Sequence, residues 1–469
     1  MERLLRRVAF GIVGLLVVVL AAATLLGRFY GQSSVLSGIY HAWWFILLWA
    51  LLAVAAMVYI LCVKGRLSLL LLHASFVVVL LGAFVSFLTS RHGTIELAQE
   101  GAPASMFTTT DGALEKLPFR LQLEAVDTVA SMNGGQPAGY IARITVDDKE
   151  QIIAHTLSLN NPVSIKEYQF CIKGMVDGGL SLLVTYDVCG RPISYVGYAM
   201  VFFSFLLLFF DRRSGFNTLL QKLRGSRFPK SSAIKADGDV SLSRLAKKMF
   251  VVMLCLLVLW CLLWYWRGVF PATNGAEALI LLAIFVALLA VVLKSKKEFA
   301  LLSRVLVVAA GLIAIVAGCS LDGYGGVQPI LRTPLLGVHV TTIIIAYALL
   351  ACTAVNAVIA LCVKDKKRME SQALLGRVLL YPATMLLAAG IFIGAVWANF
   401  SWGRYWGWDP KEVWALITLL VCSVAFHTRS LSFIAKPKAF HIFCIVAFVA
   451  VLFTFFGVNY LLGGLHSYA

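Results

Sequence analysis

A short stretch rich in tryptophan and glycine is the part of the sequence best suited to bind a large planar ligand. Four tryptophans fall within thirteen residues, interleaved with glycines and charged side chains. Flat aromatic rings offer apolar faces to such a ligand, and a nearby cation can pair with carboxylates on its edge. A porphyrin with two propionates has this shape and charge. The residues are Trp402, Trp406, Trp408 and Trp414, with Arg404 or Lys411 as the cation.

The same stretch also carries the signals of a helix start. Asp409 suits the N-cap position, Pro410 the first helical position, and Glu412 completes a capping box. An aromatic belt at a membrane surface is the other simple explanation. A belt does not require so many tryptophans in so few residues, so ligand binding is favoured. The predicted binding set is Trp402, Arg404, Trp406, Trp408, Asp409 and Trp414.

Four of the eight histidines occupy positions suited to ligation of haem iron. His73 lies six residues inside an apolar segment, roughly 9 Å from its end, and an ionisable group at that depth is a functional candidate. His427 lies at a similar depth in the segment that starts at the tryptophan-rich loop. His339 opens another apolar segment, and His466 follows the last one. Six-coordinate haem iron takes two axial ligands, which predicts the pairs His73/His427 and His339/His466.

The other four histidines have no comparable placement. We expect them to be interfacial or surface residues, because a lone histidine is more often structural than a ligand. They are His41, His92, His155 and His441.

The composition places the chain in a lipid bilayer. Of its 469 residues, 60% are hydrophobic and only 13% are charged. Apolar windows of about 20 residues recur along the chain, which predicts an all-α polytopic membrane protein. The net charge of +17 does not indicate nucleic-acid binding, because Lys and Arg lie mainly in short hinges between apolar segments. About eleven transmembrane helices are predicted, at 8–26, 41–63, 67–89, 194–210, 249–266, 277–293, 299–318, 338–363, 374–397, 413–429 and 440–458.

Charge sets the predicted orientation of these spans. With the N-terminus inside, every basic hinge falls on the inner side, and the tryptophan-rich loop (about 398–414), His339 and His466 fall outside. The basic hinges contain Lys64, Arg66, the stretch 211–248, Lys294, Lys296, Lys297, Lys364, Lys366, Lys367, Arg368, Lys436 and Lys438.

One long outer segment, about 91–193, is predicted to form a small β-rich extracytoplasmic domain. Leu180, Leu182 and Val184 alternate with small or polar residues, as a half-buried strand requires. The turn-rich triplets 133–135 and 177–179 separate such runs. Cys171 and Cys189 lie in this segment, and the sequence leaves open whether they form a disulfide. The chain has no Cys-x-x-Cys pair.

The motif Trp-Gly-x-x-Trp-x-Trp-Asp-Pro-Lys-Glu, followed by Trp-Ala-Leu-Ile-Thr, resembles the tryptophan-rich (WWD) signature of CcsA, the haem-handling half of the System II cytochrome c synthases. The front of the chain resembles ResB (CcsB), its usual partner, in span order and in the helix of His73. The outer domain is shorter than is usual in that family. The resemblance implies a ResB-like part at 1–210 with four spans, a basic cytoplasmic linker at 211–248, and a CcsA-like part at 249–469 with seven spans.

The resemblance also implies a function. Such proteins carry haem b across the membrane and attach it, as a holocytochrome c synthase (haem lyase), to the Cys-x-x-Cys-His motif of apocytochrome c. The paired histidines fall at the family's positions for haem ligands. The implied partners are apocytochrome c, a thioredoxin-like thiol reductant system and membrane lipid, with no nucleic acid. The implied location is the bacterial cytoplasmic membrane, with the N-terminus cytoplasmic and the C-terminus periplasmic.

Three other functions fit part of the pattern. A haem exporter or delivery protein without ligase activity would use the same sites. A b-type cytochrome electron-transfer subunit commonly places two ligands on one helix, whereas these four candidates lie on three spans and a tail. A cofactor-free transporter would be colourless when purified.

Overall fold

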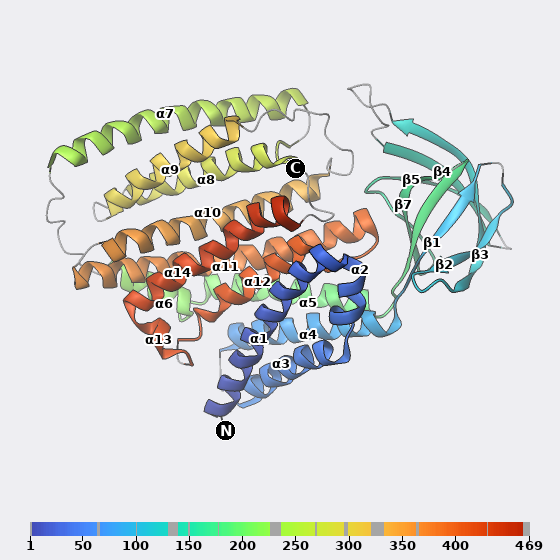
Figure 1. Cartoon of the computed structure of the whole chain (residues 1–469), viewed down its shortest axis with the longest axis horizontal. Helices are drawn as coiled ribbons and strands as arrows, with labels where there is room; N and C mark the ends of the chain where they lie inside the picture. The colour runs from blue at the N-terminus through green and yellow to red at the C-terminus, as the bar shows by residue number, and fades with distance from the viewer. Residues whose placement is uncertain are drawn as a thin grey trace.

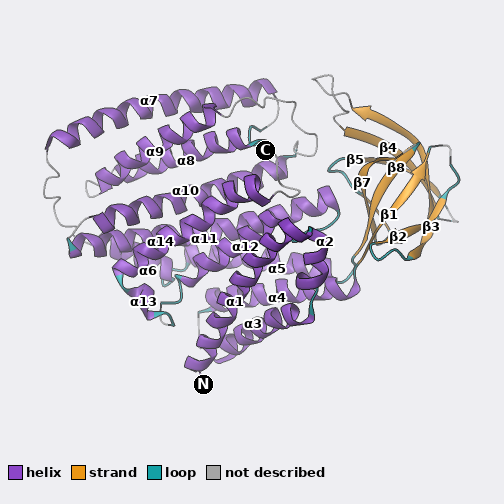
Figure 2. Ribbon diagram, viewed as in Figure 1, coloured by secondary structure: helices purple, strands orange, loops and turns teal. Residues whose placement is uncertain are grey.

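The protein consists of a helical bundle with one β-sheet at one end of it (Figures 1 and 2). The computed structural model describes residues 2–62, 66–99, 101–129, 139–148, 151–176, 178–225, 236–267, 270–294, 299–319, 333–362, 365–428 and 430–462. We call the end of the bundle that carries the sheet the sheet end, and the opposite one the far end.

The helices follow the apolar segments of the sequence. The first group is α1 (Glu2–Tyr30), α2 (Gln32–Val35), the π-helical turn η1 (Leu36–Tyr40), α3 (Trp43–Cys62), α4 (Leu67–Thr89), α5 (Gly190–Phe210) and α6 (Gly215–Gly225). The second group is α7 (Ala236–Arg267), α8 (Gly275–Lys294), α9 (Ala300–Cys319), α10 (Pro334–Cys362), α11 (Lys366–Trp402), α12 (Pro410–Val424), α13 (Ser432–Ala435), α14 (Pro437–Leu452) and the π-helical η5 (Phe453–Leu462).

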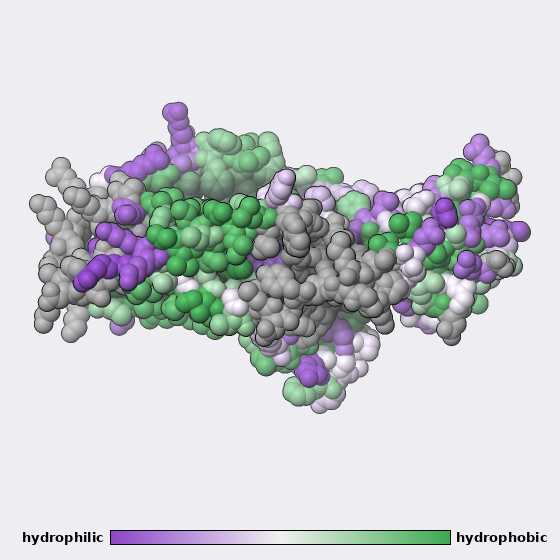
Figure 3. Space-filling view, turned by 90° about the horizontal axis from the view of Figure 1, so that it is seen from above, coloured by the Kyte–Doolittle hydropathy of each residue, from purple (hydrophilic) through white to green (hydrophobic). Residues whose placement is uncertain are grey.

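The prediction of a multi-span helical membrane protein is confirmed. Within the described ranges, nine helices are long and apolar enough to cross a membrane, and ten if the bent pair Gln32–Tyr40 and Trp43–Tyr59 counts as one span. Apolar residues dominate the middle of the bundle surface, and hydrophilic residues gather toward the far end (Figure 3). The predicted span at 413–429 is not among these helices, because α12 has only 15 residues, whereas about 20 are needed to cross a bilayer.

A single antiparallel sheet accounts for the predicted β-rich domain, which is confirmed. Its eight strands run in the order β5-β4-β3-β2-β1-β8-β7-β6. The predicted alternation holds, since Leu180, Leu182 and Val184 are buried at 0–1% exposure. The strands are β1 (Arg91–Ala98), β2 (Ala104–Thr109), β3 (Leu114–Val129), β4 (Gly139–Asp147), β5 (Ile152–Ser158), β6 (Val163–Ile165), β7 (Tyr168–Val176) and β8 (Gly179–Tyr186).

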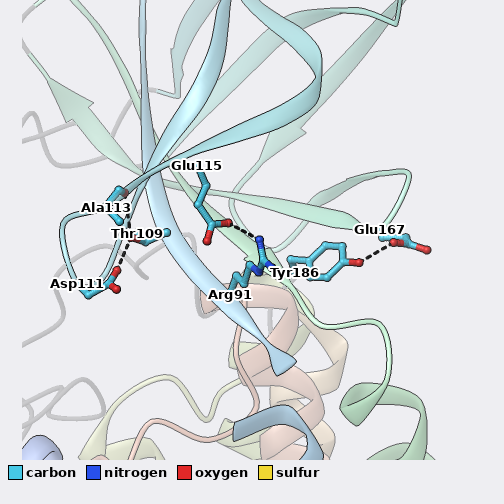
Figure 4. Close-up of polar contacts among 7 residues, drawn as sticks. All are labelled: Arg91, Thr109, Asp111, Ala113, Glu115, Glu167 and Tyr186. Carbon is cyan, nitrogen blue, oxygen red and sulfur yellow. Dashed lines mark hydrogen bonds and ion pairs between the residues drawn. The ribbon is translucent and has the colours of Figure 1, made fainter. Parts of the chain in front are cut away.

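Polar contacts also join side chains of separate strands and turns in the sheet (Figure 4). Arg91 on β1 pairs with Glu115 on β3 at 3.0 Å, and the Tyr186 hydroxyl donates to Glu167 at 3.0 Å. In the β2–β3 turn, Thr109 donates to Asp111 and to the carbonyl of Ala113. An exposed ion pair of this kind contributes up to about 1 kcal/mol, so the sheet depends mainly on its apolar core.

Helices α4 and α5 lead into and out of the sheet and pack unusually close together. A Cβ atom added at Gly82 would lie 2.4 Å from the Ser194 hydroxyl, and one at Gly190 would lie 2.1 Å from the Ser86 hydroxyl. Small residues allow such close backbone approach between membrane helices. This packing fixes the two chain crossings between bundle and sheet, and with them Ser86 and the residues just before α5.

The remaining sequence predictions concern two cysteines, the linker and residues that the structure does not describe. Cys171 and Cys189 are both free thiols. The predicted linker 211–248 contains α6 and the first residues of α7. Lys64, Lys296, Lys297, Lys364, the turn 133–135, Asp177 and the linker residues 226–235 lie outside the described residues.

Candidate haem sites

His73 and His427 lie side by side at the far end of the bundle. Their ring centroids are 6.2 Å apart and their planes are nearly perpendicular, at 89°. Two imidazoles that bind one iron from opposite faces stand about 6 Å apart between ring centres, since each metal–nitrogen bond is about 2 Å and each nitrogen lies about 1 Å from its ring centre. The observed separation of the ring centroids is close to that of a bis-histidine pair.

Hydrogen bonds leave the same nitrogen of both rings available to a metal. His73 Nδ1 is 2.8 Å from the carbonyl of Leu69, and His427 Nδ1 is 3.0 Å from the carbonyl of Ser423. A carbonyl only accepts, so each Nδ1 carries the proton and each Nε2 carries the lone pair. A backbone carbonyl on the second nitrogen is the usual support of a metal-binding histidine.

Aromatic side chains from two further helices flank this pair. The ring of Phe10 on α1 packs edge-on against His427 at 5.2 Å, and the ring of Tyr59 on α3 lies 5.4 Å from His73. Three helices, α1, α3 and α4, thus meet the turn after α12, where His427 lies three residues beyond the helix end rather than within a span. The apolar rings suit the edge of a porphyrin.

His339 lies near the start of α10 at the sheet end, held against α11. Its Nδ1 is 2.7 Å from the carbonyl of Gly390, so Nε2 again carries the lone pair. Gly394 allows this approach, because a Cβ atom there would lie 2.5 Å from the His339 ring. The predicted partner, His466, lies outside the described residues.

The contact between Gly394 and His339 yields a testable prediction. Gly394→Ala is expected to displace the His339 ring and weaken haem binding at the sheet end about tenfold, since overpacking by one methyl commonly costs 1–3 kcal/mol. Haem titration of the purified protein measures the effect. Gly318→Ala is the matched control, because, apart from its own helix backbone, no atom of the described residues lies within 4 Å of a Cβ atom placed at Gly318 on α9. Equal affinity in the two variants would contradict the assignment of His339 as a ligand.

The tryptophan-rich loop is shorter than predicted and is fixed at both ends. α11 continues to Trp402 and ends at Gly403, whose φ of 70° is the left-handed conformation that glycine adopts without strain. The predicted capping box at the start of α12 is confirmed, with Asp409 and Glu412 in their expected roles. Glu412 also accepts from the backbone N–H of Gly407 at 2.9 Å. Asp409 is buried, at 5% exposure, and its side chain caps α12, so it fixes the end of the loop.

The four tryptophans do not form one flat platform. The rings of Trp406 and Trp408 stand perpendicular at 5.8 Å, and Trp408 stacks on Tyr40 at 4.4 Å and 9°. Trp414 lies 4.0 Å from Phe453, and its indole N–H donates to Thr24. The structure thus gives Trp408 and Trp414 aromatic partners of their own.

Trp402 packs beside the start of α10, the helix that carries His339. Its ring packs edge-on against buried Trp397 at 4.9 Å, within a cluster formed with Leu336 and Val340 at the start of α10. Val340 follows His339 in the chain, so Trp402 and His339 occupy one region of the sheet end. Trp397 belongs to this region although the sequence placed it inside a span.

The two predicted cations have different surroundings. Lys411 Nζ donates to Asn459 Oδ1 at 2.9 Å, which ties the start of α12 to η5. Arg404 is exposed in the loop and lies beside Gly407, where a Cβ atom would be 2.9 Å from its guanidinium. Arg404 is accordingly the more accessible of the two for an incoming carboxylate.

Two of the remaining histidines have notable environments. His441 was predicted to be interfacial or surface, but it is completely buried and its Nε2 is 3.1 Å from the carbonyl of Met369. His92 on β1 is partly buried at the sheet end. The pKa of His92 is lowered, mainly by burial; the negative charge of Asp187 opposes this shift, and the positive charges of Arg404 and Arg191 add to it. A lowered pKa favours the neutral ring at pH 7.

Asp187 is a residue that sequence reasoning missed. Its carboxylate is 6% exposed and accepts hydrogen bonds from the hydroxyls of Ser86 and Tyr405, both at 2.6 Å, and from the backbone N–H groups of Gly190 and Arg191. It therefore joins α4, the start of α5 and the tryptophan-rich loop at one point. The one signal in the sequence was that an Asp, at position 187, lies just before the start of an apolar helix, where such a residue often caps the helix.

Removal of the Tyr405 hydroxyl should destabilise this junction. Tyr405→Phe is expected to lower stability by about 1.5–3 kcal/mol, since a hydrogen bond to a buried carboxylate is lost. Thermal unfolding of the haem-free protein measures the effect. Tyr265→Phe serves as the comparison, because Tyr265 is 90% exposed. Identical unfolding temperatures in the two variants would show that the hydroxyl does not secure the loop.

Comparison with known proteins identifies the two parts of the chain. A family model described as Cytochrome C assembly protein matches residues 272–466, and one described as ResB-like family matches residues 62–189. The first contains His339, His427 and the tryptophan-rich loop, and the second contains His73 and the sheet.

Individual relatives agree with this division. The chain is 30% identical over 285 residues to the cytochrome c biogenesis protein CcsA of Coffea arabica, covering 50% of this chain and 88% of that protein. It is 34% identical over 246 residues to CcsA of Chlamydomonas reinhardtii, covering 47% and 67%. Protein NrfI of Wolinella succinogenes is 37% identical over 154 residues, which cover 30% of this chain and 17% of NrfI. The chain belongs to the CcsA family of cytochrome c biogenesis proteins and carries a ResB-like part fused ahead of the CcsA-like part.

Proposed function

We propose that the chain transports haem across the bacterial cytoplasmic membrane and attaches it covalently to apocytochrome c on the outer side. The observation that carries this proposal is the 6.2 Å separation of the His73 and His427 rings. Haem b is the proposed substrate, because it carries the free vinyl groups that attachment requires. His73 and His427 hold it near the cytoplasmic face.

At the outer face, His339 and His466 are the proposed axial ligands, with Trp402, Trp406 and Arg404 around the porphyrin. Trp408, Trp414 and Asp409 shape the loop. Ligation from both sides fixes the iron and orients the vinyl edge toward the acceptor, which is catalysis by positioning. Each acceptor thiol then adds across one vinyl double bond, forming a carbon–sulfur and a carbon–hydrogen bond with no net redox change. This reaction requires no nucleophile from the chain.

The proposal fixes the partners and the orientation. The acceptor is a Cys-x-x-Cys-His apocytochrome c, whose histidine replaces one outer ligand. A thioredoxin-like reductant keeps its thiols reduced, and membrane lipid surrounds the helices. The N-terminus is cytoplasmic and the C-terminus periplasmic. The proposed parts are 1–210, a cytoplasmic linker at 211–248, and 249–469.

Co-expression tests this proposal directly. The chain is produced with a Cys-x-x-Cys-His reporter in a host that lacks its own maturation system, and covalent haem is detected on the denatured reporter. Covalent product is the expected result. Haem-loaded protein without product would favour an exporter or delivery protein instead, and a colourless protein would contradict haem handling altogether.

A further inference from the structure

The segment from Gln32 to Tyr40 contacts the tryptophan-rich loop although it lies far from it in sequence. It connects α1 to α3, and it falls outside the residues matched by either family model, 62–189 and 272–466. Figure 1 shows α2 beside the start of α12 at the sheet end. The segment ends in a π-helical turn, Leu36–Tyr40, a rare form that often marks functional sites.

Trp408 has a backbone conformation that needs external support. Its φ is +55°, in the left-handed region that a bulky side chain rarely adopts. Such a conformation persists only where its surroundings hold it. Glu412 fixes the chain on both sides of Trp408, since Gly407 before it and Asp409 after it each donate a backbone N–H group to the Glu412 carboxylate.

Two residues of the amino-terminal segment hold Trp408 itself. The Gln32 amide donates to the Trp408 carbonyl at 2.7 Å, and the buried Tyr40 ring stacks on the Trp408 ring at 4.4 Å and 9°. Phe45 closes the edge of the same ring at 5.4 Å. Both the backbone and the side chain of Trp408 are thus fixed from α2, η1 and α3.

The position of Trp408 determines that of its neighbour. Trp406 stands perpendicular against the Trp408 ring at 5.8 Å, so a shift of Trp408 shifts Trp406 as well. A further contact, from the Trp414 indole N–H to Thr24 on α1 at 3.0 Å, joins the start of α12 to the same amino-terminal helices.

We propose that Gln32 and Tyr40 are positioning residues for the tryptophan-rich loop, because they fix Trp408 and thereby set where the loop presents Trp406 to haem. This inference rests on the proposed function of the loop. Neither residue touches the substrate on this account. Tyr40 acts through its ring alone, since its buried hydroxyl has no hydrogen-bond partner within the described structure.

The test uses the full-length protein with two independent readouts. The first is amide hydrogen exchange of residues 403–409 in haem-free protein. The second is the absorption spectrum and reduction potential of haem at the sheet end, with haem at His73/His427 as the internal reference. Tyr40→Leu is expected to speed exchange of the loop about tenfold, the upper range for loss of an aromatic stack, and to shift the outer haem alone.

Conservative variants separate positioning from general damage. Tyr40→Phe keeps the stack and should behave like wild type, as should Trp43→Leu, because Trp43 is 77% exposed. Gln32→Glu replaces the donor by an acceptor at an exposed position and should speed loop exchange, whereas Ser33→Glu should not. If the Tyr40→Leu protein does not accumulate, the comparison of Gln32→Glu with Ser33→Glu still tests the proposal.

The outcomes are distinguishable. Unchanged loop exchange in Tyr40→Leu or Gln32→Glu would overturn the positioning role, and so would equal effects of Tyr40→Phe and Tyr40→Leu. A wild-type protein without bound haem would instead overturn the proposed function, while the exchange measurement would still report whether Gln32 and Tyr40 fix the loop.

Discussion

His339→Gly is expected to lower both the haem held at the sheet end and the yield of covalent cytochrome by about tenfold or more. Removal of one axial ligand leaves the iron with a single protein bond at that site, and changes to weaker supporting contacts already cost 10–100-fold. Added imidazole should partly restore both quantities, because it fits the space left by the side chain. Pyridine haemochrome content and covalent haem on the reporter are the measurements.

A matched substitution controls for general effects of histidine loss. His155→Gly changes a residue on the edge strand β5 that is not among the proposed haem ligands. It should leave haem content and product unchanged, and imidazole should have no effect on it. Full haem content and full product in His339→Gly would refute the ligand assignment.

His73→Gly is expected to have the second large effect, and on both sites. Haem enters through the His73/His427 pair on the proposed route, so loss of this pair should deplete the outer site as well. We expect total haem per protein to fall about tenfold and imidazole to restore part of it.

The asymmetry between the two variants tests the direction of transfer. His339→Gly should retain haem at His73/His427, whereas His73→Gly should lose haem at both places. Haem content at each site, read from spectra of the two variants, decides this. A His73→Gly protein with a fully loaded outer site would contradict inward-to-outward transfer through this pair.

The helical fold was predictable because long apolar runs have few alternatives in lipid. The span predicted at 67–89 is the helix Leu67–Thr89 itself. The span predicted at 413–429 was less accurate, since hydropathy continues through Ala425 and Phe426 while the chain already turns. A hydropathy profile depends only on residue type, so it does not detect a turn made of apolar residues.

Local features of the site were likewise predictable, and long-range contacts were not. The capping box at Asp409 joins residues three apart, so its pattern is visible in the sequence. The bond from Gln32 to Trp408 joins residues 376 positions apart, and no local pattern announces it. The same holds for Asp187 and Tyr405. The sequence therefore identified the tryptophans but assigned them one common role, whereas packing gives Trp408 and Trp414 partners of their own.

The proposed haem ligation accounts for the position of His73 and His427 at one end of the bundle and of His339 and the tryptophan-rich loop at the other. Electron paramagnetic resonance of the purified, oxidised protein tests this claim most directly, because each bis-histidine haem gives its own low-spin signal. The account predicts two such signals, of which His339→Gly removes one and His73→Gly removes both. A protein without low-spin haem, or signals that neither substitution alters, would contradict it.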